Sequence, residues 1–72
     1  MSMWQDYLAR VQKDLEQLRA DLAPLVGGEM KLRERLGNGE WRDVTQDQID
    51  HLNRVIDTYE RIAEAIRKRV PF

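Results

Sequence analysis

The sequence contains no cysteine, so neither a disulfide bridge nor a cysteine-based zinc site can support its fold. This absence matters because the chain has only 72 residues, and a domain of that size buries little core. Small domains compensate with disulfides, with a metal or by oligomerising. We therefore expect a single domain over residues 1–72 that gains part of its stability by self-association.

A strong net charge and a long apolar run are also missing. The net charge is −1, and the charged residues, 35% of the chain, alternate in sign. No global field would therefore attract nucleic acid or an anionic membrane. No apolar run approaches the ~20 residues of a membrane span, and residues 1–6 contain an acid and do not look like a signal peptide. We expect a cytoplasmic protein without a membrane partner.

The side chains that catalysis requires are scarce. The single histidine, His51, follows Asp47 by four residues. This pair could form half of a metal site in a symmetric dimer, but a boundary histidine beside an acid is the simpler interpretation. Gly27-Gly28 lacks the lysine and hydroxyl of a phosphate-binding loop. We predict no catalytic residue, no metal ligand and no cofactor, and a protein that is not an enzyme.

What the sequence does contain is apolar periodicity, first in its N-terminal third. The apolar residues recur at alternating intervals of four and three: Trp4, Leu8, Val11, Leu15, Leu18, Leu22 and Leu25. This spacing places them on one face of a helix. Pro24 and Gly27-Gly28 indicate where that helix ends. We predict a helix over residues 3–25.

A second periodic stretch begins after Thr45. Its apolar residues again follow a helical spacing: Ile49, Leu52, Ile56, Tyr59, Ala63, Ile66 and Val70. Val55 and Ile62 widen this apolar stripe. Thr45 and Gln48 have the spacing of a capping box, with the threonine as N-cap. We predict a helix over residues 46–69, antiparallel to the first.

The connector, residues 26–45, is too long for a structureless loop in a small domain. Turn residues at 37–39 lie between two stretches of alternating character, which is typical of a β-hairpin. A three-residue loop with Gly39 in the left-handed region pairs Glu34 with Arg42 and Arg33 with Asp43, both of opposite charge. A two-residue loop would instead pair like charges. We predict a β-hairpin within residues 30–44.

The predicted fold is therefore mostly α: an antiparallel helical hairpin with a small β-hairpin in its connector, dimerising into a four-helix bundle. The alternative for the connector is a short third helix, because residues 29–36 are mostly good helix formers that end at a glycine. Two helices alone would leave part of the broad apolar stripe exposed to water, and a second chain would cover it. The residues that we predict at the dimer interface are Trp4, Leu8, Val11, Leu15, Val55, Tyr59, Ile62 and Ile66.

The connector also concentrates basic residues around an aromatic one. The predicted partner-contacting surface consists of Arg33, Arg35, Trp41 and Arg42, because arginine and tryptophan are enriched where proteins contact each other. The hypothesis that follows is a small helical interaction or adaptor protein that acts as a homo-oligomer. The alternative is an antitoxin-like regulator that binds nucleic acid through the basic connector. Interleaved acids and the net charge make nucleic acid the less favoured partner.

Overall fold

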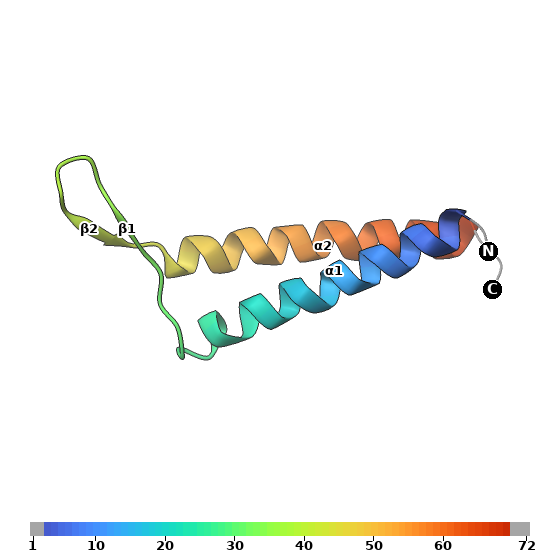
Figure 1. Ribbon diagram of the computed structural model, residues 1–72, viewed down its shortest axis with the longest axis horizontal. Helices are drawn as coiled ribbons and strands as arrows, with labels where there is room; N and C mark the ends of the chain where they lie inside the picture. Colours follow the sequence, from blue (N-terminus) through green and yellow to red (C-terminus); the bar gives the residue numbers. More distant parts are fainter. Residues whose placement is uncertain (1–2, 70–72) are drawn as a thin grey trace.

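The computed structural model describes residues 3–69 and consists of two long helices joined by a connector that carries a β-hairpin (Figure 1). The elements are α1 (Met3–Val26), β1 (Arg33–Arg35), β2 (Trp41–Asp43) and α2 (Thr45–Arg69). The helices are antiparallel, so the start of α1 and the end of α2 meet at one end of the molecule, and the hairpin projects beyond the other end. The predicted helical hairpin with strands in its connector is confirmed; the alternative third helix is wrong.

Helix α1 ends in a backbone motif that its glycines make possible. Gly28 has a φ of 79°, in the left-handed region that favours glycine. The N–H of Glu29 donates to the carbonyl of Pro24 at 2.9 Å, and the N–H of Gly28 donates to that of Leu25 at 3.4 Å. These two bonds form a Schellman cap, which satisfies carbonyls that the last turn leaves open. Helix α1 consequently ends at Val26, one residue later than the sequence suggested.

The core is a single seam between the two helices. Its buried cluster contains the following residues: Leu8, Val11, Leu15, Ile56, Ala63 and Ile66. The side chains that pack partly buried against it are Leu18, Leu22, Tyr59 and Ile62. In the described part of the chain no polar or charged residue is buried. The 4-3 spacing of both helices produces this arrangement, because it aligns one apolar face of each helix along its whole length.

The β-hairpin has the predicted register, with Arg33 opposite Asp43 and Arg35 opposite Trp41. Its loop is also the predicted one, because Gly39 has a φ of 87° and its N–H donates to the carbonyl of Leu36 at 2.9 Å. A three-residue loop whose last residue is left-handed closes a hairpin in this way. The connector therefore has structure of its own, although neither strand buries a side chain.

The junction between the hairpin and α2 differs from the expected capping box. The Thr45 hydroxyl accepts from the N–H of Leu32 at 2.9 Å and lies 3.3 Å from the Leu32 carbonyl. The N–H of Gln48 donates to the carbonyl of Val44 at 3.0 Å, so the helix begins one residue earlier than predicted. The N–H of Thr45 is bound by Asp43 Oδ1 at 2.8 Å. Thr45 therefore fastens the hairpin to the helix, and Asp43 caps the helix.

Candidate interaction surfaces

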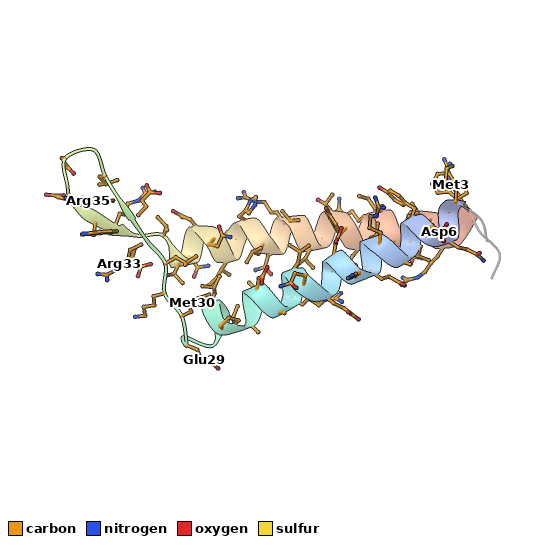
Figure 2. The ribbon with its side chains drawn as sticks, in the orientation of Figure 1. Met3, Asp6, Glu29, Met30, Arg33 and Arg35 are labelled. Carbon is orange, nitrogen blue, oxygen red and sulfur yellow. The ribbon has the colours of Figure 1, made fainter. Side chains whose placement is uncertain are left out.

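Two arginines and a tryptophan gather on one face of the projecting hairpin. The guanidinium carbons of Arg33 and Arg35 lie over the Trp41 ring, at 5.8 Å and 5.9 Å from its centroid. Both distances are within the range of a cation–π contact. Trp41 nevertheless remains 61% exposed, and both arginines are exposed. Figure 2 shows Arg33 and Arg35 on the hairpin, at the opposite end of the molecule from Met3 and Asp6.

The structure separates Arg42 from the rest of the predicted partner surface. Because successive strand residues point to opposite faces, Arg42 shares its face with Glu34 and not with Trp41. Its guanidinium lies 3.5 Å from the Glu34 carboxylate and 3.7 Å from that of Asp47 at the start of α2. Arg42 therefore ties the back of the hairpin to the helix, and three of the four predicted residues form the exposed cluster.

Lys31 extends the cationic face in place of Arg42. It lies two residues before Arg33, so the alternation along this extended segment assigns Lys31, Arg33 and Arg35 to one side. The positive charges of Lys31 and Arg33 both lower the pKa of Asp43, which lies on that side. The predicted partner-contacting surface does not include Lys31, although strand alternation alone places it beside Arg33.

Asp43 is already engaged within the chain. Hydrogen bonds from Thr45, its side chain first and its backbone N–H next, hold the pKa of the Asp43 carboxyl below its ordinary value, with Lys31 and Arg33 adding smaller effects in the same direction. The carboxylate is thus the capping group of α2 as well as the neighbour of the cations. The hairpin face therefore carries three cations beside an anion that Thr45 already binds. We call Lys31, Arg33, Arg35 and Trp41 the basic face.

The two long flanks of the helical hairpin have different chemistry. One flank is polar, and Arg19 of α1 forms an ion pair across it with Glu60 of α2 at 3.0 Å. Its remaining exposed lining residues are Gln12, Glu16, Glu64 and Arg67. Charged side chains on both helices therefore cover this flank, and the surface that it offers a partner is mostly polar.

The other flank is apolar, especially near the start of α1. Trp4 and Tyr7 contact each other edge to face, with ring centroids 6.5 Å apart. They line a hollow of about 540 Å³ together with residues of α2, among them Ile62 and Ala65. Arg69 closes its edge, with its guanidinium carbon 5.3 Å from the centroid of the Trp4 ring. Trp4 and Tyr7 are both exposed in the single chain.

The predicted dimer-interface residues divide between this flank and the core. Four of them are buried in the seam of the single chain: Leu8, Val11, Leu15 and Ile66. The others lie outside that seam: Trp4 is exposed, whereas Val55, Tyr59 and Ile62 are half-buried. Of the predicted interface residues, this second group is the one that a partner could contact, and Tyr7 lies beside Trp4. We call Trp4, Tyr7, Val55, Tyr59 and Ile62 the apolar flank.

The remaining sequence candidates do not assemble into a site. His51 is exposed, and within residues 3–69 no three acidic or histidine side chains lie close enough together to hold a metal ion. Neither described helix is apolar enough over a sufficient length to cross a membrane. Comparison with protein-family models, with curated proteins and with solved structures gives no match. Functional inference therefore rests on the two surfaces just described.

Proposed function

We propose that this protein is a non-enzymatic interaction module that acts as a homodimer. Two helical hairpins pack by their apolar flanks into a four-helix bundle, and the β-hairpins contact another protein. The observation that supports this function is the contrast between the two flanks, since only one has aromatic and aliphatic side chains outside the core.

A second copy of the chain is the occupant that the apolar flank favours. A buried aromatic side chain removes about 150–250 Å² from water, and burial contributes roughly 25 cal/mol per Å² of apolar area. Trp4 and Tyr7 still expose 38% and 45% of their surface, so covering that remainder contributes roughly a few kcal/mol at a dimer interface by the same area estimate. Because the opposite flank is charged, the association closes at two copies instead of growing into a filament.

The test is the mass of the protein in solution, measured by light scattering over a range of concentrations. We expect the wild-type chain to have twice the mass of one chain, and Tyr7→Glu to have the mass of one. Val26→Glu is the matched control, because Val26 is a 63% exposed apolar residue of α1 outside the apolar flank. A wild-type monomer, or dimers that Tyr7→Glu leaves unchanged, would contradict the proposal.

A further inference from the structure

Asp43 lies opposite Arg33 on the basic face of the β-hairpin, but its carboxylate is already bound by the N–H of Thr45. Among residues 3–69 no ion pair within 4.0 Å engages Arg33 or Arg35, although Arg42 on the other face makes two. The strands that carry these arginines are exposed along their whole length. Packing in a core therefore does not explain why arginines occupy these positions. Their arrangement is consequently available to a ligand.

The contacts with Trp41 hold both guanidiniums in positions from which they can bind anions. Both guanidiniums stay within 6 Å of the ring, and an arginine fork whose N–H donors make no ion pair can bind a carboxylate in a bidentate pair. Holding two such groups in place also lowers the conformational entropy that binding would otherwise cost. The geometry therefore favours a ligand with at least two carboxylates.

The same contacts disfavour a nucleic acid strand. Strands of that kind bind by stacking their bases on exposed aromatic rings. Here the arginine side chains lie over the Trp41 ring, at under 6 Å from its centroid. A base that stacked on the part of the ring near these arginines would have to displace them and lose both contacts. The opposite face of the hairpin, with Glu34 and Glu40, would also repel a phosphate backbone that wrapped around it.

The spacing of the cations indicates the shape of the ligand. Lys31, Arg33 and Arg35 occupy alternate positions, and alternate residues of an extended chain are about 6–7 Å apart. An extended partner segment repeats its own side chains at the same interval. Its acidic residues at alternate positions would therefore face successive cations of the hairpin.

We propose that the basic face, Lys31, Arg33, Arg35 and Trp41, binds an extended acidic segment of a partner protein whose carboxylates occur at every second residue. This inference rests on the proposed function as an interaction module and names the chemistry of its partner. Complementary charge supplies the attraction and sets the register. Binding therefore weakens as salt concentration rises.

The experiment is a titration of the full-length chain with a short synthetic peptide in which glutamate alternates with serine. Trp41 emission is the readout, in a Trp4→Phe background that leaves Trp41 as the only tryptophan. The neutral control peptide replaces each glutamate with glutamine. A single-stranded oligothymidylate of equal charge tests the nucleic acid alternative. We expect saturable binding of the glutamate peptide alone, weakened by salt.

The matched variants distinguish the effect of the basic face on peptide affinity from the effect of the protein's overall charge. Arg33→Gln combined with Arg35→Gln is expected to weaken peptide binding by about tenfold or more, one decade in Kd. Lys13→Gln combined with Arg54→Gln removes the same charge from exposed positions on the helices and is expected to leave Kd unchanged. Arg33→Lys combined with Arg35→Lys keeps the charge and loses the planar fork, so its affinity is expected to fall between the two.

Three outcomes would overturn the inference: no binding of the glutamate peptide, tighter binding of the oligonucleotide, or equal weakening by both pairs of glutamine substitutions. Light scattering on the chain that retains Trp4 keeps this result apart from the dimer proposal, because Trp4 belongs to the apolar flank. A dimer that does not bind the peptide contradicts only the acidic-segment inference, and a monomer that does bind it contradicts only the homodimer. A far-ultraviolet circular dichroism spectrum verifies that each variant retains its helices.

Discussion

The helical seam and the β-hairpin are held together by different means. In the seam, buried aliphatic side chains of α1 and α2 pack along one line, and every charged group stays outside. In the hairpin no strand residue is buried, and the order comes from a left-handed glycine, cross-strand pairing and the Thr45 junction. The seam is therefore stabilised by apolar area, and the hairpin by backbone geometry.

This difference indicates which positions can carry functional side chains without disturbing the packing of the core. Residues of the seam are constrained by packing, because interiors leave little space for change. Strand side chains of the hairpin meet no such constraint, yet Arg33, Arg35 and Trp41 form an organised cluster. An exposed aromatic held between cations is not needed to close the loop. The contrast supports assigning partner contact to the hairpin and stability to the seam.

The largest effect is expected from breaking the seam. Leu15→Ala removes a buried side chain from the centre of the core, and such a change destabilises by about 2–5 kcal/mol. Because small domains have little stability to lose, we expect a large drop in the urea midpoint followed by circular dichroism. Val26→Ala, at an exposed site of the same helix, is the control. Equal midpoints for the two variants would show that the seam does not dominate stability.

An intermediate effect is expected at the junction. Thr45→Val keeps the shape of the side chain and removes the hydroxyl that bonds to the backbone of Leu32. A part-buried N–H left without its partner costs about 1–3 kcal/mol. We expect faster hydrogen exchange at the Leu32 amide and a smaller change in global stability. Thr58→Val is the matched control, because the Thr58 hydroxyl donates only to a carbonyl of its own helix; exchange at Leu32 should not respond to it.

A smaller effect, confined to the hairpin, is expected at its loop. Gly39→Ala places a side chain at a φ of 87°, which costs roughly 1 kcal/mol for an L-residue. The added carbon would meet only an ordinary contact, with Arg35 at 3.9 Å. Strain therefore comes from the backbone, and cross-strand NMR contacts between Arg35 and Trp41 should weaken while the helical signal is unchanged.

Gly37→Ala provides the comparison within the same loop. Gly37 has no neighbour within 4 Å of an added carbon and no positive φ. The substitution reduces the freedom of the unfolded chain without straining the native one. We expect it to be neutral or slightly stabilising. Equal losses at both positions would contradict the loop geometry described here.

Much of this fold could be predicted from the sequence because its signals are local. The 4-3 spacing identifies both helices without reference to tertiary contacts. In the connector, charge opposition favoured one register and disfavoured the alternative, and that register is present. Gly39 was assigned to the left-handed position because a three-residue loop requires it there, as the structure confirms.

The surfaces were harder to predict because they depend on how the elements meet. Thr45 has the sequence signature of an N-cap, but the hairpin brings Leu32 beside its hydroxyl, and this non-local contact replaces the capping box. Arg42 was grouped with Trp41 by proximity in sequence, whereas strand alternation turns it toward Glu34 and Asp47. The heptad pattern also could not distinguish residues that face α2 from residues on the open flank.

The smallest expected effect is a response of the junction to acid, with Asp43 as its origin. Bonding by Thr45 depresses the pKa of the folded Asp43 carboxyl, whereas an unfolded aspartate titrates near ~3.9. The ionised group therefore favours the capped form above the unfolded pKa, and this contribution is lost as pH falls through the lower, folded value. Because Asp43 is exposed, water screens its interactions, and the helices should persist when the cap is lost.

The measurement is an NMR titration of the Thr45 amide proton, which lies within hydrogen-bond distance of Asp43 Oδ1 at 2.8 Å. Its chemical shift should follow the protonation of Asp43, with a midpoint below that of an unfolded aspartate, and Asp43→Ala should abolish the change. Asp50→Ala is the control, since the Asp50 carboxylate accepts from Gln46 farther along α2 and its loss should leave the Thr45 titration intact. A midpoint at or above the unfolded value would show that Thr45 does not stabilise the carboxylate. The hairpin would then be joined to α2 by the Thr45–Leu32 bonds and by Arg42, without a contribution from Asp43.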